Sequence, residues 1–225
     1  MSPPLIVAID GPSGAGKSSA ARALAARLGV PYIDTGAMYR AVGLAARERG
    51  IALPIADPDA VAALVSGASI ELVPSPGGNR VLLDGRDVSE AIREPEISLY
   101  ASAVSAIPAV RRSLVAVQQR LGKERGGVME GRDIGTRVFP DTPYKFFLTA
   151  DPSVRAQRRT RELEARGTPQ PYEDVLRDME KRDRDDGSRA DSPLTYDSRY
   201  VLVDSTGRPL EAVVDEIEGR VREAI

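Results

Sequence analysis

The chain has 225 residues, of which 28% are charged, and a formal net charge of −2 at pH 7. This length suits one domain with an ample core, and the slight negative charge argues against a binder of DNA or RNA polymers, which is usually basic. Cysteine and histidine are both missing from the sequence, which excludes a cysteine nucleophile, a serine–histidine–aspartate triad, a zinc site of the cysteine/histidine type and histidine acid–base catalysis.

The sequence predicts a cytoplasmic protein with no membrane partner. The apolar run at residues 5–9 is short, follows no basic segment and precedes no cleavage site. No stretch has the length of a membrane-spanning helix. We expect a monomer.

The first predicted elements form a phosphate-binding unit. The apolar residues 5–10 predict a buried parallel strand, and the stretch 17–29 predicts a helix that ends at Gly29. The sequence between them fits G-x-x-x-x-G-K-[ST], a loop whose backbone N–H groups surround a phosphate at a helix N-terminus. The alternative is a glycine-rich turn that fits by chance, which the strand and helix disfavour. The predicted ATP-binding residues are Gly11, Pro12, Ser13, Gly14, Ala15, Gly16, Lys17, Ser18 and Ser19.

Two side chains of this loop carry its chemistry. Lys17 reaches the outer phosphates of a bound nucleotide, and the hydroxyl of Ser18 is the predicted ligand of Mg²⁺. No other metal ligand is predicted.

Residues 30–36 predict a short strand that ends in a turn at Thr35 and Gly36, followed by a helix over 37–49. Arg40 lies about one helical turn after Gly36. We expect it to face a phosphate; the alternative is a solvated arginine on a helix.

A change of pattern marks a small insert in the middle of the chain. Asp57 and Pro58 predict a capped helix start. The predicted elements are a helix over 57–66 and strands at 69–73, 80–84 and about 86–88, with a loop over 74–79.

The rest of the chain alternates helices with strands. The predicted helices are 95–107, 108–125, 151–166, one beginning at Pro171, and 210–225, and the predicted strands are 128–130, 144–148 and 200–203. Five parallel strands separated by helices predict an α/β three-layer sandwich with a five-stranded parallel sheet. The phosphate loop, Asp34-Thr35-Gly36, Gly131-Arg132-Asp133 and the turn 149–151 all follow strands, so they should meet at one edge of the sheet.

Phosphoryl transfer between two nucleotides requires a second phosphate site lined with arginines. Gly131-Arg132-Asp133 places a cation and a carboxylate at a strand end, although a structural ion pair would look the same. The charged stretch 181–189 lies between the fourth and fifth strands, where a lid over the phosphates is expected. The alternative there is a solvated helix end.

Together these segments resemble the bacterial cytidylate kinases, members of the nucleoside monophosphate kinase superfamily of P-loop proteins. The resemblance runs over nearly the whole chain and is carried by residues 9–18, 34–40, 131–136, 138–141 and 182–189. It implies a kinase core at about 1–56, 95–170 and 195–225, a β-containing monophosphate-binding insert at about 57–94 and a helical lid at about 171–194.

The resemblance also implies the reaction and its residues. The reaction is ATP-dependent phosphorylation of CMP and dCMP, with Mg²⁺ as cofactor. The implied catalytic residues are Lys17, Arg132, Arg182 and Arg189. The implied CMP-binding residues are Thr35, Gly36, Arg40, Ser102, Arg111, Arg132, Asp133, Arg182, Asp186 and Arg189.

Within that set the resemblance assigns Ser102, Arg111 and Asp133 to the cytosine. An ionised Asp133 would face the carbonyl of uracil unfavourably, which favours cytosine over uracil. Arg182 and Asp186 match contacts to the ribose, with a register that rests on spacing in a charged run.

Two other functions fit parts of the pattern. A kinase for another small acceptor, such as shikimate, would not need residues that read cytosine. A nucleotide-controlled switch would not need a second arginine-rich site, and Asn79, the single asparagine, leaves no Asn-Lys-x-Asp motif for guanine.

Overall fold

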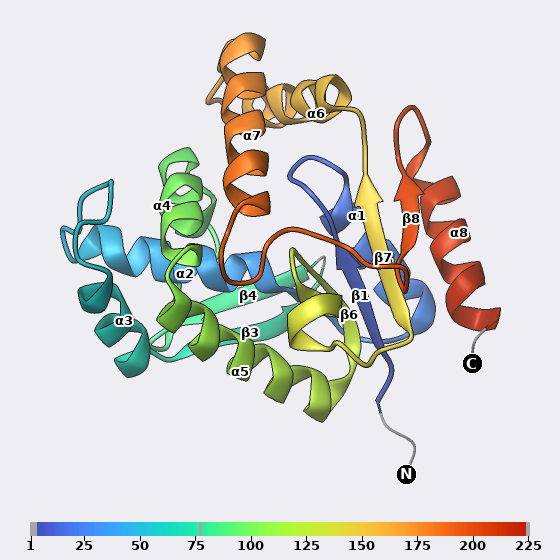
Figure 1. The fold of residues 1–225 in the computed structure, drawn as a ribbon, viewed down its shortest axis with the longest axis horizontal. Helices are drawn as coiled ribbons and strands as arrows, with labels where there is room; N and C mark the ends of the chain where they lie inside the picture. Colours follow the sequence, from blue (N-terminus) through green and yellow to red (C-terminus); the bar gives the residue numbers. More distant parts are fainter. Residues whose placement is uncertain (1–3, 77, 224–225) are drawn as a thin grey trace. The chain divides into compact units, whose positions relative to one another are not determined.

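The fold is described from a computed structural model, which covers residues 4–76 and 78–223. The chain divides into two compact units, and Figure 1 labels their elements. Unit 1 is built on Pro31–Gly126, and unit 2 is built on Leu5–Val30 and Gly127–Ile225.

Unit 2 alternates strands with helices. Its strands are β1 (Ile6–Asp10), β6 (Gly127–Gly131), β7 (Tyr144–Thr149) and β8 (Val201–Asp204). Its helices are α1 (Lys17–Leu28), α6 (Pro152–Ala165), α7 (Tyr172–Gly187) and α8 (Leu210–Glu223), with a π-helical segment at Ile134–Val138.

The predicted fold class is confirmed. A parallel sheet of five strands in the order β2-β6-β1-β7-β8 is flanked by helices, where β2 is Tyr32–Asp34. Within unit 2, Asp10 at the end of β1 lies opposite Gly131 of β6 and Phe147 of β7. The phosphate loop and the turn after β6 therefore leave the sheet at the same edge, as the strand pattern predicts.

The core of unit 2 forms because its central strand is apolar up to Asp10. Val7, Ala8 and Ile9 of β1 have no exposed surface, as expected for a parallel strand covered on both faces. Helix α8 packs against α1 and β7 and buries Val213 and Ile217. This packing holds α1, the helix that follows the phosphate loop.

Unit 1 combines helices with a small antiparallel sheet. After β2 come α2 (Thr35–Glu48), α3 (Pro58–Gly67), β3 (Ile70–Ser75), β4 (Gly78–Leu83), β5 (Arg86–Asp87), a 3-10 turn (Ala91–Arg93), α4 (Pro95–Ser105) and α5 (Pro108–Arg125). The predicted insert strands are confirmed as the sheet β3-β4-β5. The carboxylate of Asp57 accepts hydrogen bonds from two N–H groups of α3, so the predicted cap is confirmed as well.

Two local predictions are wrong. The turn at Thr35 and Gly36 is the first turn of α2, because the side chain of Asp34 accepts a hydrogen bond from the Ala37 N–H at 2.9 Å and caps the helix two residues early. The loop over 74–79 is shorter than predicted, because Pro74 pairs with Asn79 and extends the hairpin on both sides.

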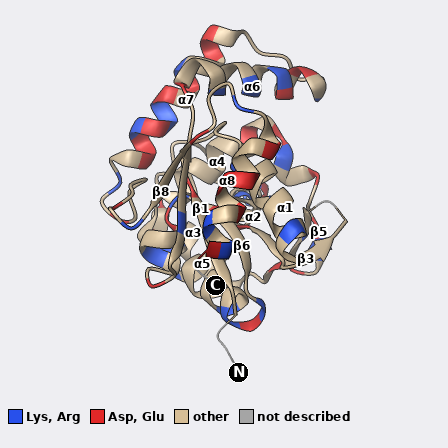
Figure 2. Cartoon of the chain, turned by 90° about the vertical axis from the view of Figure 1, so that its right-hand side faces the viewer, with Lys and Arg blue, Asp and Glu red and all other residues tan. Residues whose placement is uncertain are grey.

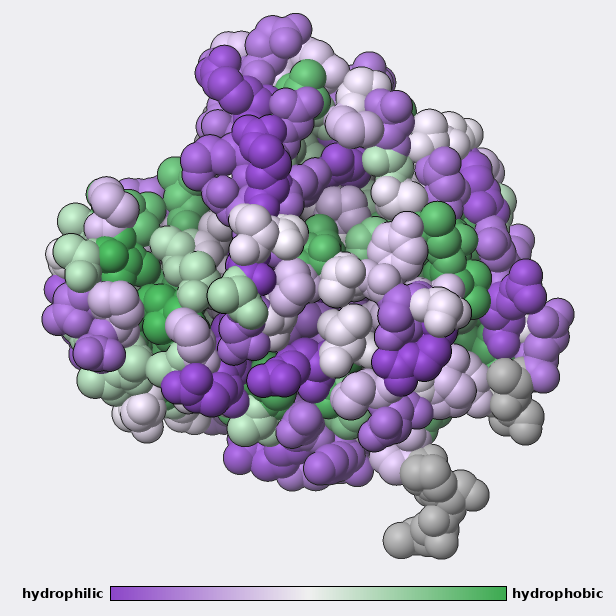
Figure 3. All heavy atoms as spheres, viewed as in Figure 1, coloured by the Kyte–Doolittle hydropathy of each residue, from purple (hydrophilic) through white to green (hydrophobic). Residues whose placement is uncertain are grey.

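The surface of α7 is strongly polar. Basic and acidic residues alternate along it in Figure 2, and hydrophilic side chains cover it in Figure 3. Among the residues that the structure describes, no helix combines the length and the apolar character that crossing a membrane requires.

Candidate active site

Unit 2 holds the phosphate loop between β1 and α1. Gly16 immediately precedes α1 and adopts φ 91°, a left-handed conformation that suits glycine. The predicted strand, loop and helix are therefore confirmed as local structure.

Side chains from other parts of unit 2 hold the carbonyl groups of this loop. Four successive carbonyl oxygens accept hydrogen bonds: Pro12 from Lys17 Nζ at 2.7 Å, Ser13 from Arg155 Nη1 at 3.1 Å, Gly14 from Arg158 Nη1 at 3.5 Å and Ala15 from Ser205 Oγ at 2.9 Å. Carbonyl groups held in this way leave the N–H groups of the loop to form a concave anion site. Sequence reasoning missed Arg155, Arg158 and Ser205, since lone residues far along the chain carry no pattern that links them to the loop.

Lys17 lies within reach of the charges of two arginines, Arg132 and Arg182. Burial and these two charges together lower the pKa of Lys17 to about 7, against the opposing effects of Glu130 and Asp10. Cations this close together repel each other unless an anion lies among them. The cluster therefore suits a highly charged anion such as a phosphate chain.

A carboxylate lies beside the predicted metal ligand. Ser18 Oγ donates a hydrogen bond at 2.9 Å to Glu130, which is buried in β6. Sequence reasoning missed Glu130, although its place near the end of a strand beside the loop is a usable signal. The part of the chain that the structure describes holds no group of three or more His, Cys, Asp or Glu side chains that could bind a metal. A hydroxyl and one carboxylate fit a hard cation that takes its remaining ligands from phosphate and water.

Asp186 brings two predicted site arginines together. Its side chain is 1% exposed; one oxygen pairs with Arg132 Nε at 3.0 Å and the other pairs with Arg189. Burial by itself would raise the pKa of Asp186, but Arg132, Arg189 and Arg182 together lower it, so the carboxylate stays ionised. The predicted residues Arg132, Asp186 and Arg189 thus lie together in unit 2, and Asp186 orients the two arginines.

Asp10 anchors the turn that carries Arg132 and the buried Asp133. The carboxylate of Asp10 accepts hydrogen bonds from the N–H groups of Ile134 and Gly135, both at 2.9 Å, and from the Tyr200 hydroxyl at 2.8 Å. Burial raises its pKa to about 6 in spite of these bonds. Asp10 was not among the predicted site residues, and its role is to position the turn.

Replacing Tyr200 with phenylalanine should destabilise the protein more at pH 8 than at pH 5. The pKa of Asp10 in the folded state lies above its ordinary value of 3.8, so ionisation of Asp10 costs stability as the pH rises from about 4 to 6, and the Tyr200 hydroxyl reduces that cost. We expect a loss of about 1.5–3 kcal/mol at pH 8 and a smaller loss at pH 5, measured by urea unfolding.

The control for this measurement is Tyr196→Phe, because Tyr196 is half exposed and packs its ring on Phe147. Its effect should stay within about 0.5 kcal/mol at both pH values. Equal losses in the free energy of unfolding at pH 5 and pH 8 for Tyr200→Phe would show that Asp10 does not ionise between these two pH values.

Unit 1 brings Thr35, Gly36 and Arg40 together at the N-terminus of α2. Asp34 Oδ2 pairs with Arg40 Nη2 at 3.1 Å and draws the guanidinium back toward this helix end. Asn79 of β4 fixes the preceding strand, because it donates to the Tyr32 carbonyl at 2.9 Å and accepts from the Asp34 N–H at 3.1 Å. A helix N-terminus beside a guanidinium is suited to a phosphate group.

Unit 1 also links Ser102 to Arg111. The guanidinium of Arg111 is buried, donates to the Ser105 carbonyl at 3.0 Å and lies 5.4 Å from the centre of the Tyr39 ring. Ser105 Oγ in turn donates to the Ser102 carbonyl at 2.8 Å. Both predicted base-reading residues of this unit therefore belong to one polar cluster.

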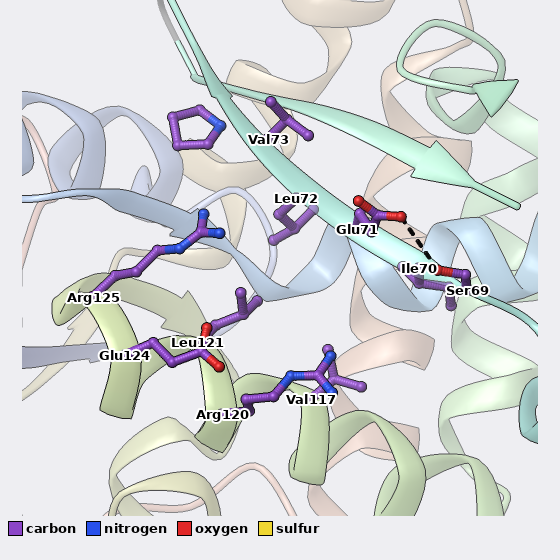
Figure 4. A pocket seen from close by; sticks show the side chains of 11 residues that line it. Ser69, Ile70, Glu71, Leu72, Val73, Val117, Arg120, Leu121, Glu124 and Arg125 are labelled. Atoms are coloured by element: carbon purple, nitrogen blue, oxygen red, sulfur yellow. Dashed lines mark hydrogen bonds between the residues drawn. The ribbon is translucent and has the colours of Figure 1, made fainter. Parts of the chain in front are cut away.

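A groove of about 430 Å³ also lies in unit 1, between β3 and the C-terminal half of α5 (Figure 4). Figure 4 shows Leu72 and Leu121 inside it, with the charged side chains of Arg120 and Glu124 on α5. None of the predicted site residues lines this groove.

Comparisons with known proteins find similar sequences over nearly the whole chain. The family model described as cytidylate kinase matches residues 7–223. The cytidylate kinase of Rhodococcus opacus (strain B4) is 49% identical over 218 residues, which cover 96% of this chain and 93% of the relative. The cytidylate kinase of Caldanaerobacter subterraneus subsp. tengcongensis is 47% identical over 216 residues, covering 96% and 94%.

Among solved structures, an uncharacterised protein from Eubacterium ventriosum ATCC 27560 is similar with a TM-score of 0.54. The match covers 97% of this chain and 98% of that chain at 13% identity. At that identity the likeness concerns the fold alone.

Proposed function

The chain belongs to the cytidylate kinase family and phosphorylates CMP with ATP as the donor, and we propose that it accepts dCMP as well and works through the two sets of residues described above. The observation that carries the assignment of residues is the cluster of Lys17, Arg132 and Arg182 in unit 2. Such a cluster fits the phosphates of ATP and the group in transfer, because both carry several negative charges.

ATP binds to residues 11–19. The N–H groups of the loop and the ammonium group of Lys17 contact its phosphates, and Ser18, which donates a hydrogen bond to Glu130, would hold Mg²⁺ together with that carboxylate. When bound, Mg²⁺ neutralises part of the charge on the β- and γ-phosphates.

The phosphate of the acceptor nucleotide binds at the N-terminus of α2, where Thr35, Gly36 and Arg40 lie together. Ser102, Arg111 and Asp133 read the cytosine, whose amino group donates and whose ring nitrogen and carbonyl accept hydrogen bonds. In this proposal these three side chains read the base and not the sugar, so they do not discriminate against dCMP, and contacts to the sugar fall to Arg182 and Asp186.

The transfer needs no general base, because the attacking phosphate oxygen is already anionic. That oxygen forms a bond to the γ-phosphorus of ATP, the bond to the β–γ bridging oxygen breaks, and ADP leaves with the electron pair. Arg132, Arg182 and Arg189 neutralise the charge on the group in transfer, and Asp186 orients two of them. Helix α7 is the proposed lid that keeps water from accepting the phosphoryl group.

Among nucleoside monophosphates, CMP should react at least about tenfold more efficiently than UMP or AMP, since those lack the donor and acceptor pattern that the base readers match. A coupled assay of ADP formation with CMP, dCMP, UMP, AMP and GMP measures this preference. Equal kcat/KM values for CMP and UMP would contradict the role of Asp133, and an acceptor outside the nucleotides would contradict the whole assignment of the second site.

The proposed setting is the cytoplasm, where ATP and CMP are found, and the proposed working form is a monomer without a nucleic acid polymer or a membrane as partner. The net charge of −2 agrees with the absence of a polyanionic partner. Light scattering of the purified protein tests the oligomeric state.

A further inference from the structure

One nitrogen atom connects the lid helix to the phosphate loop. Arg155 Nη1, on α6, donates to the Ser13 carbonyl at 3.1 Å and to Asp183 Oδ2 on α7 at 2.7 Å. Arg155 is only 5% exposed, and its Nε donates to the Ala150 carbonyl at 3.0 Å, so the guanidinium is fixed from three directions.

We propose that Asp183 is a positioning residue for phosphoryl transfer, which couples the place of α7 to the conformation of the phosphate loop through Arg155. This inference rests on the proposed function, because it assigns α7 as the lid. Asp183 itself contacts neither nucleotide in this proposal.

Met179, one helical turn before Asp183, also connects α7 to the phosphate loop. A Cβ atom placed on Gly14 would lie 2.8 Å from Met179 Cε, so α7 touches the loop next to Ser13. Met179 also packs with Val175 against Ala156 and other residues of α6. Helix α7 therefore acts on two adjacent residues of the loop. Met179 lies against Gly14, and Asp183 is connected to Ser13 through Arg155.

The same face of α7 also reaches the turn after β6, which carries Arg132. Met179, Asp183 and Asp186 stand at positions i, i+4 and i+7, which share one side of a helix. Asp183 pairs with Arg155, and Asp186 pairs with Arg132 after β6. If α7 moved away from the other elements of unit 2, both ion pairs would break together. One face of α7 therefore helps to hold both the phosphate loop and the turn after β6 in place.

The geometry of Asp183 is poorly suited to stability alone. Its Oδ1 is buried and, within the residues that the structure describes, has no hydrogen-bond partner. The Asp183 side chain is 23% exposed, so its pair with Arg155 is only partly buried, and an unsatisfied oxygen within it costs free energy. A role in holding Arg155 against the loop explains why an acidic residue stands there.

Replacement of Asp183 by asparagine tests the coupling. It removes the charge that holds Arg155 and nearly preserves the volume of the side chain. We expect kcat/KM for ATP to fall about tenfold, the cost of losing one charge-assisted hydrogen bond. We also expect the ratio of ATP hydrolysis without CMP to phosphoryl transfer with CMP to rise about tenfold, because a displaced α7 admits water.

That ratio separates positioning from mere loss of folded protein, since unfolding lowers both rates equally. The matched control is Asp185→Asn, on the same helix, where the carboxylate is half exposed and pairs with the exposed Lys181. Its ratio should stay within about twofold of the original protein.

A second variant tests the path through Arg155. In the Arg155→Met background, adding Asp183→Asn should change the ratio less than twofold, because the cation that bridges Ser13 and Asp183 is already gone. Full, independent effects of the two substitutions would overturn the proposal, as would an unchanged ratio in Asp183→Asn alone.

Failure of the proposed function gives a different result. The original protein would then not phosphorylate CMP, whereas failure of the coupling leaves that activity intact. Affinity for a non-hydrolysable ATP analogue, measured without CMP, tests the coupling even in that case: Asp183→Asn should weaken it and Asp185→Asn should not.

Discussion

Replacing Lys17 with methionine should lower kcat/KM for CMP phosphorylation by about a thousandfold, because a buried cation at the reacting phosphates supplies much of the electrostatic stabilisation of the transition state. The same change should leave the free energy of unfolding equal or higher. The Lys17 side chain is 6% exposed and lies near Arg132, so its charge is unfavourable in the folded protein until an anion binds.

The measurements are steady-state kinetics and urea unfolding without nucleotide. Lys123→Met is the control, because Lys123 is exposed near the end of α5, and it should keep kcat/KM within about twofold. A fall in kcat/KM of less than about tenfold for Lys17→Met would show that Lys17 does not stabilise the transition state of phosphoryl transfer. A large loss of stability would show that Lys17 serves the loop mainly through its bond to the Pro12 carbonyl.

Replacing Gly11 with alanine should prevent stable folding of unit 2, with a cost of about 4 kcal/mol or more. A Cβ atom on Gly11 would lie 2.0 Å from the carbonyl oxygen of Leu148, which is backbone of β7 and cannot rotate away. Gly11 also adopts φ +147°, a conformation that other residues rarely take. Relief would require β1 and β7 to separate.

Gly29→Ala is the matched control for this substitution. Gly29 adopts φ +66° at the end of α1, but a Cβ there would meet nothing within 4 Å. Only the backbone strain remains, at about 1–2 kcal/mol. Urea unfolding gives the loss in free energy of unfolding for each variant. Similar losses would mean that β1 and β7 separate at less cost than the contact with Leu148 implies.

The order of elements could be predicted because their signals are local. The strand before the loop is a run of apolar residues, and the cap at Asp57 with Pro58 depends on neighbours in the sequence. The start of α2 was predicted two residues late, since Gly36 is a common turn residue and the cap by Asp34 overrides that preference. The hairpin at Pro74 was predicted too short for a similar reason: cross-strand pairing with Asn79 overrides two turn-forming residues.

The candidate site could be predicted where a motif or a resemblance fixes residues at short spacing. Lys17, Ser18, Arg132, Arg182 and Arg189 are predicted in that way. The residues that position them were not found, because each acts through a single contact across a large gap in the sequence. Tyr200 reaches Asp10 and Ser205 reaches Ala15, each 190 positions away, and neither pair leaves a local pattern.

The carbonyl contacts of the phosphate loop also bear on how the protein is made. Residues 11–16 leave the ribosome before Arg155, Arg158 and Ser205, whose side chains donate the hydrogen bonds that hold the loop's carbonyl groups. Strand β1 likewise pairs with β6 and β7, which lie more than a hundred residues later. A nascent chain that ends before Ser205 therefore carries the whole nucleotide motif without all of the contacts that shape it. Truncated chains released during translation should consequently not trap ATP in the cell.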